Sequence, residues 1–123
     1  MQQMIAITKA MADESRLRVL CWLREGELCL CQIVAMLDLA PSTVSRHMAV
    51  LVQCGLVVGQ KDGRWMYYHL PSRLATTQIK ETHKWLKRMM TDDPTLQADL
   101  KKLTKIRSQD PSQLCEITYG KSE

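Results

Sequence analysis

The chain has 123 residues, 46% of them hydrophobic, which suits one domain with a modest core. No apolar run approaches the ~18 residues that a membrane-spanning helix needs, and the first residues lack the basic and apolar regions of an export signal. We therefore expect a cytoplasmic protein whose five cysteines stay reduced and serve metal binding or thiol chemistry.

The net charge of +4 is unevenly distributed along the chain. Residues 41–90 carry eight Lys or Arg against two Asp or Glu, whereas the segments before and after carry slightly more acidic than basic residues. A solvated basic face would explain a charge excess by itself. The concentration of the basic excess in one segment favours a polyanionic partner.

The first half of the chain predicts four short helices. The first covers residues 2–11, and the second follows Asp13, whose side chain suits an N-cap. The third is expected from about Leu28 to Leu37. The fourth begins at Pro41 and ends near Cys54.

The second half begins with a different periodicity. Residues 56–61 and 64–70 are rich in strand formers, and Asp62-Gly63 between them is a hairpin signal. A helix after Pro71 carries an apolar stripe from Leu74 to Met89, which requires a partner surface.

This order of elements describes a winged helix-turn-helix, a fold that is mainly α with a small β-hairpin. In such a fold the third helix is a support and the fourth lies in the DNA major groove. Short hydroxyls and arginines can bind phosphates or base edges, although a plain amphipathic helix would also show a polar outer face. The candidate DNA-binding residues on the fourth helix and the hairpin are Ser42, Thr43, Ser45, Arg46, His47, Lys61 and Arg64.

Four motifs together resemble one family: DESRLR at 13–18, ELCLCQI at 27–33, STVSRH at 42–47 and DGR at 62–64. They closely resemble the ArsR/SmtB metalloregulators, and in particular the arsenical-resistance repressor branch, over roughly residues 3–90. The resemblance implies a homodimeric repressor, without a catalytic cofactor, that leaves double-stranded operator DNA when As(III) or Sb(III) binds cysteines of the third helix. It also implies a dimer interface formed by the first helix and the helix after the hairpin.

One position departs from this family pattern. Members with a complete site on the third helix carry another Cys where this chain has Val34. Trivalent arsenic prefers three soft thiolates, so Cys29 and Cys31 need a third ligand. Cys115, from the same or the other subunit, is the candidate. Cys54 and an external thiol are alternatives, and an idle surface thiol would also explain Cys115.

The spacing of Cys29 and Cys31 predicts a switch. Side chains two residues apart on a helix point about 200° apart, so both thiols cannot bind one ion while that turn is helical. Ligation is therefore expected to distort the third helix and the support that it gives the recognition helix.

We expect three segments: a winged-helix and dimerisation domain at 1–91, an additional helix at 92–107 that follows Asp93-Pro94, and a flexible tail at 108–123 carrying Cys115. Two other functions fit parts of the sequence. One is a redox-sensing repressor of the same fold, in which oxidation of Cys29 or Cys31 releases DNA. The other is a Cys-dependent reductase, against which the chain offers no phosphate-cradling loop and no general base beside a thiol.

Overall fold

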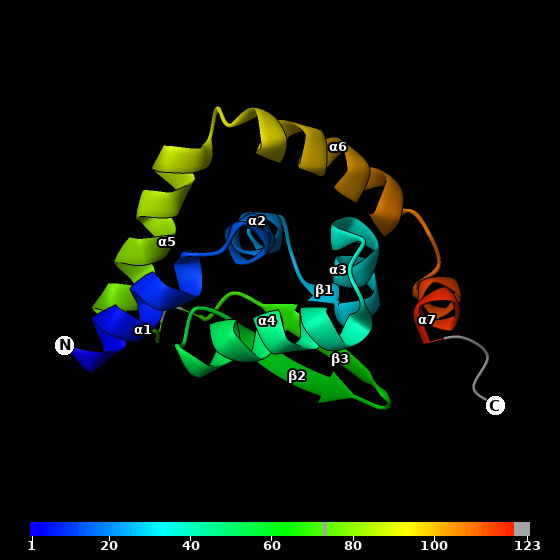
Figure 1. Cartoon of the computed structure of the whole chain (residues 1–123), viewed down its shortest axis with the longest axis horizontal. Coiled ribbons are helices and arrows are strands. Elements are labelled where there is room, and N and C mark those ends of the chain that lie inside the picture. The colour runs from blue at the N-terminus through cyan, green and yellow to red at the C-terminus, as the bar shows by residue number, and fades with distance from the viewer. Residues whose placement is uncertain (73, 120–123) are drawn as a thin grey trace.

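A computed structural model describes residues 1–72 and 74–119, and only the backbone of residues 118 and 119. In these residues a helical body carries a small antiparallel sheet, as the winged helix-turn-helix prediction requires (Figure 1). The helices are α1 (Gln2–Met11), α2 (Glu14–Leu23), α3 (Leu30–Leu37), α4 (Pro41–Gln53), α5 (Thr77–Met90), α6 (Pro94–Arg107) and α7 (Pro111–Tyr119). The strands are β1 (Leu28–Cys29), β2 (Val58–Asp62) and β3 (Trp65–His69).

Helices α1 and α2 begin and end close to the predicted residues. Asp13 caps α2, because its side chain accepts a hydrogen bond from the Arg16 backbone N–H at 3.1 Å. The second half of α2 is buried, and Trp22 is among the largest fully buried side chains. Buried residues of α1, α3 and α4 belong to the same core cluster, so the four predicted helices share one core.

Helix α3 begins two residues later than predicted. Leu28 and Cys29 form β1, which pairs with β3 so that Cys29 lies opposite Tyr67. Cys29 has an extended backbone and is the N-cap of α3, and its N–H donates to Gln32 Oε1 at 2.9 Å. The first N–H groups of a helix lack partners within the helix. Here the Gln32 side chain accepts from the Cys29 N–H, and the residues just before α3 are held by the pairing of β1 with β3.

The hairpin of β2 and β3 forms the wing, and its loop is shifted by one residue from the prediction. Asp62 pairs with Trp65, so the two loop residues are Gly63 and Arg64. Gly63 has φ +64°, which suits the first central position of a two-residue hairpin loop. The shift places Arg64 at the very tip of the wing.

Helix α5 begins at Thr77, later than predicted, with the Thr76 hydroxyl as its cap. Its apolar stripe already has a partner within the chain, because Ile79 and Leu86 are buried in the core. The prediction of an unpaired stripe is therefore wrong for these two residues. Among the described residues of α5, the large exposed apolar side chains are those of Trp85 and Met89.

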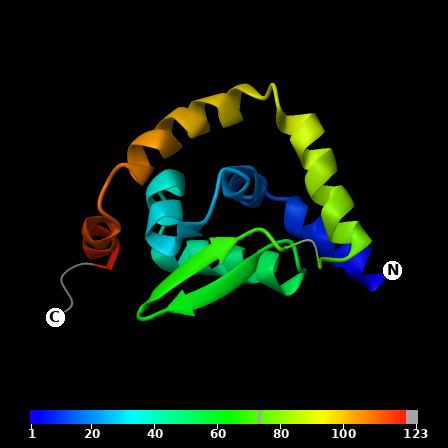
Figure 2. The same ribbon diagram turned by 180° about the vertical axis from the view of Figure 1, so that it is seen from behind.

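Helix α6 covers the side of α2 and α3 that faces away from the wing, and α7 lies beside α3 (Figure 2). α6 packs on both helices, and α7 packs on α3 through the buried side chains of Leu114 and Cys115. The expectation of a flexible tail is thus wrong for residues 111–119, which form a packed helix; residues 120–123 lie outside the described part. Within that part, none of the helices is long and apolar enough to cross a membrane.

Candidate functional site

Helix α4 lies on the same side of the molecule as the wing (Figure 1), and several of its exposed residues are polar. Val44, Met48 and Leu51 anchor the helix in the core. At other positions of the helix, Ser42, Ser45 and Arg46 are exposed and Thr43 is half-buried. The arrangement leaves hydroxyls and a guanidinium available to a ligand that lies along α4.

His47 lies on a different face of α4 from Arg46. It is half-buried, and its Nδ1 lies 3.1 Å from Arg16 Nη1 and 4.0 Å from Asp13 Oδ1. These contacts connect α4 to the start of α2. His47 also serves packing between the two helices, and its contact with DNA stays a prediction.

The wing presents two cationic side chains. Lys61 and Arg64 are both exposed, and neither side chain makes a hydrogen bond or ion pair with the residues that the structure describes. Both guanidinium and ammonium groups therefore remain available for phosphates or a groove floor.

Three cysteines meet between the start of α3, α7 and the wing. Cys29 and Cys31 come from the β1–α3 junction, and Cys115 comes from α7, 84 residues after Cys31. The three residues line one small cavity of about 50 Å³ together with Leu30 and the wing residues 64–66. The structure thus brings together the three predicted metalloid ligands.

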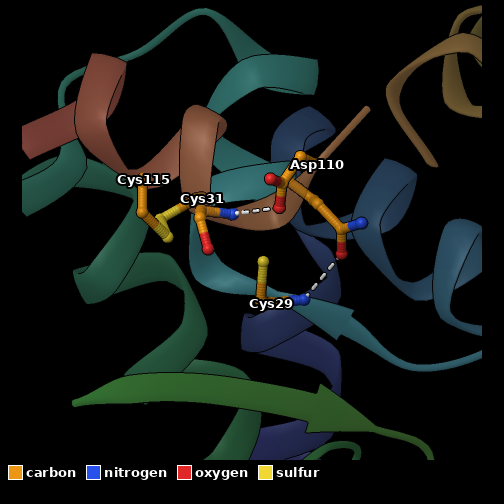
Figure 3. The surroundings of a disulfide bond; sticks show 6 residues. Cys29, Cys31, Asp110 and Cys115 are labelled. Carbon is orange, nitrogen blue, oxygen red and sulfur yellow. Dashed lines mark hydrogen bonds between the residues drawn. A yellow bond between two sulfur atoms is a disulfide. The ribbon is translucent and has the colours of Figure 1, made fainter. Parts of the chain in front are cut away.

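Two of these cysteines are covalently joined. Cys31 and Cys115 form a disulfide with a Cα–Cα distance of 5.2 Å, while Cys29 is a free, buried thiol beside them (Figure 3). Asp110, just before α7, lies next to the backbone at Cys31 in the same view. As they stand, the described residues contain no group of three or more Cys, His, Asp or Glu arranged to hold a metal ion. The expectation that all thiols are reduced is wrong for this pair, and reduction must precede its use as ligands.

The other two cysteines lie outside the cavity. Burial raises the pKa of the Cys21 thiol in the core of α2. Burial also raises the pKa of Cys54 at the end of α4, where Sγ lies 3.3 Å from the Leu51 carbonyl oxygen. A raised pKa disfavours the thiolate that binds soft ions, so neither thiol suits the proposed ligand set.

The sequence did not indicate that the wing borders the thiol cavity. Arg64, Trp65 and Met66 reach it because β3 lies between β1 and β2 in the sheet. This contact depends on a pairing between residues 28–29 and 67–68, for which two residues of sequence carry too weak a signal. Arg64 is therefore both a candidate DNA contact and a wall of the thiol cavity.

Comparisons with known proteins identify a family and similar regulators. The family described as "Bacterial regulatory protein, arsR family" matches residues 13–58. The arsenical resistance operon repressor of Escherichia coli K12 is 42% identical over 77 residues, which are 62% of this chain and 66% of that protein. The arsenic resistance transcriptional regulator ArsR1 of Pseudomonas putida KT2440 is 40% identical over 65 residues, which are 52% of this chain and 51% of that protein.

A solved structure covers more of the fold. HlyU from Vibrio cholerae N16961 is 32% identical, with a TM-score of 0.63, and the match covers 74% of this chain and 95% of that chain. The named relatives are transcriptional regulators, which favours a regulator over the reductase alternative. The chain belongs to the arsR family of bacterial regulatory proteins.

Proposed function

We propose that this chain is a transcriptional repressor that binds operator DNA as a homodimer and releases it when arsenite or antimonite binds Cys29, Cys31 and Cys115. The observation that carries the proposal is the meeting of these three cysteines in one cavity at the edge of the wing. The two relatives named for arsenic resistance support the choice of metalloid.

The donor set suits the chemistry of trivalent arsenic. Three thiolates are soft ligands, and the cavity offers three sulfurs from one chain once the disulfide is reduced. Arsenous acid then exchanges its three hydroxyl groups for three thiolates; each sulfur loses a proton, and three waters leave. No redox change at arsenic is needed for this exchange.

The position of Cys29 changes the expected route from metalloid to DNA. Cys29 precedes α3 and has an extended backbone, so Cys29 and Cys31 can face one cavity without unwinding of the helix. The prediction that ligation must distort α3 is therefore not required by the geometry. The cavity instead borders Arg64 at the wing tip, and β1 is hydrogen-bonded to β3, so we propose that ligation acts on the wing.

The test of this function is a titration of the fully reduced protein, bound to its operator, with arsenite. We expect DNA to dissociate as arsenite occupies the site, with an affinity change of ~5–150-fold, the usual range of coupling between two sites. Stable DNA binding at saturating arsenite would contradict the proposal.

Arg46 and Arg64 are expected to contribute differently to DNA binding. Arg46→Ala should lower the preference for operator over random DNA by ~1–3 kcal/mol if the side chain reads a base. Arg64→Ala should weaken binding to both sequences. A wing arginine in a narrow minor groove is attracted mainly by the negative electrostatic potential and the width of the groove. Competition between labelled operator and random duplexes measures both effects. Equal losses on both duplexes for both variants would remove base reading from α4.

DNA binding should also depend steeply on salt. The basic excess of residues 41–90 is doubled in a dimer, and each neutralised phosphate adds about −0.9 to the slope of log K against log salt. Roughly six to ten contacts are reasonable for a dimer of this size. A slope near zero would exclude DNA as a partner.

The disulfide favours a second candidate function, a repressor that responds to oxidants. Formation of the Cys31–Cys115 bond removes two protons and two electrons from the thiols, and hydrogen peroxide that accepts them is reduced to two waters. Titration of DNA-bound, reduced protein with peroxide distinguishes the two functions. Release by peroxide without any response to arsenite would favour the redox function.

A further inference from the structure

Helix α6 is attached to α2 through a buried carboxylate. Asp99 is 6% exposed and accepts hydrogen bonds from Arg18 Nε and Nη2, both at 2.8 Å, and from Trp22 Nε1 at 3.1 Å. The hydrogen bonds to Asp99 raise the pKa of the Arg18 guanidinium. A paired guanidinium and carboxylate interact through two parallel bonds in one plane, so this contact fixes the position of α6 on α2.

The second half of α6 binds backbone carbonyls near the ends of two other elements. Lys102 Nζ donates to the Met36 carbonyl near the end of α3 at 3.1 Å. Arg107 donates to the Glu25 carbonyl at 3.2 Å and to the Gly26 carbonyl at 3.0 Å. Because helix ends and turns leave carbonyls without partners, these bonds hold the end of α6 beside the segment that leads into β1 and Cys29.

Helix α7 follows after a short connection and delivers a thiol. Asp110 accepts a hydrogen bond from the Ser112 N–H at 3.0 Å, and Leu114 and Cys115 are buried against α3. Cys115 therefore lies beside Cys31 on a helix whose N-terminal end is held in place by α6.

We propose that α6 and α7 form a positioning arm, with Asp99 as the residue that holds Cys115 at the thiol cavity of its own subunit. The arm makes each subunit's thiol site complete without its dimer partner. The metalloid aspect of this inference rests on the proposed function, whereas the disulfide aspect does not.

The physical basis is effective concentration. A thiol on a loosely tethered tail samples a large volume, and its effective concentration at a second thiol is in the millimolar range. A thiol held on a docked helix has a much larger effective concentration, because the freedom of the tail is already lost. Weakening the attachment of α6 should therefore lower the tendency of Cys31 and Cys115 to pair.

The experiment measures the Cys31–Cys115 equilibrium in the full-length Cys29→Ser chain against mixtures of reduced and oxidised glutathione. Asp99→Asn keeps the shape of the side chain but removes its charge, and we expect the effective concentration to fall roughly 10- to 100-fold. Asp92→Asn removes a carboxylate from the exposed turn before α6 and should leave the equilibrium unchanged. Equal values for Asp99→Asn, Asp92→Asn and the parent would overturn the inference.

A second variant covers the case in which Asp99→Asn does not fold. Arg107→Met removes only exposed hydrogen bonds and should lower the effective concentration by up to about tenfold. Lys101→Met is its control, since Lys101 is exposed on the same helix and its side chain makes no hydrogen bond or ion pair within the described residues. A value for Arg107→Met that matches Lys101→Met would overturn the role of the arm even if Asp99→Asn unfolds.

Electrophoresis without reductant tests whether the arm acts within one subunit. Oxidised parent protein should migrate as a single chain, and a mixture of Cys31→Ser and Cys115→Ser chains should form no crosslinked dimer. A crosslinked pair in that mixture would show that Cys115 reaches the other subunit and would overturn the proposal. These measurements use neither arsenite nor DNA, so their failure is distinct from failure of the proposed repressor function.

Discussion

Cys29→Ser is expected to abolish release of DNA by arsenite while leaving operator binding intact. The serine keeps the size of the side chain but replaces a soft thiolate with a hard, neutral hydroxyl, which trivalent arsenic binds weakly. The wild-type response, a ~5–150-fold loss of DNA affinity, should disappear in the variant. Cys29 is not part of the Cys31–Cys115 disulfide, so the same variant should keep any response to peroxide.

The other cysteines give the matching controls for this experiment. Cys31→Ser and Cys115→Ser should each lose both responses, because each residue is both a proposed metalloid ligand and half of the disulfide. Cys54→Ser should keep both responses, since Cys54 does not line the thiol cavity. Cys21→Ser should act only on stability, because it buries a hydroxyl in the core at a cost of ~1–3 kcal/mol.

Fluorescence anisotropy of a labelled operator, followed during arsenite and peroxide titrations, distinguishes these outcomes. An arsenite response that survives the loss of both Cys29 and Cys31 would contradict the proposed ligand set. Retention of the response in Cys115→Ser alone would instead assign the third ligand to an external thiol.

Local signals in the sequence were enough to predict the helical body and the wing. Asp13 before α2, Pro41 at the start of α4 and Asp93-Pro94 before α6 each mark a helix start by satisfying or avoiding an orphan N–H group. Such signals act over three or four residues, and neighbouring elements change them little.

The thiol site was harder to predict because it depends on contacts between distant residues. The strand at Leu28–Cys29 exists through its pairing with β3, and local propensity alone extends α3 over it. The helix α7 did have a local signal, since Asp110-Pro111 repeats the Asp-Pro pattern before α6. Its polar composition masked that signal, and its apolar contacts come from the packing of Leu114 and Cys115 on α3.

The family resemblance implied which two helices form the dimer interface, but the side chains that face a partner required the structure, because the apolar stripe of α5 divides between the core and the surface. Leu86 is 2% exposed and lies in the core of its own chain. On α5 the exposed apolar side chains are Trp85 and Met89, and on α1 they include Met4 and Ile5. Both helices lie at the same end of the molecule (Figures 1 and 2), so we propose that this surface is the homodimer interface.

Trp85→Arg is therefore expected to give folded monomers with weak operator binding. Trp85 is 47% exposed in the single chain, so the fold loses little, while a charge replaces an aromatic anchor in the proposed interface. We expect dimerisation to weaken by about 2–4 kcal/mol, the usual cost of losing such an anchor. Sedimentation of the reduced protein measures the mass, and thermal unfolding measures the stability.

Leu86→Arg should fail in a different way, although it lies on the next position of the same helix. Its charge would be buried without a partner, at a cost of ~3–5 kcal/mol, so the chain should unfold rather than dissociate. Thr95→Arg, which adds the same charge at an exposed position on α6, should change neither mass nor stability. A dimer of unchanged mass in Trp85→Arg would move the interface away from α1 and α5, because the introduced arginine could not be accommodated at the centre of a dry apolar contact.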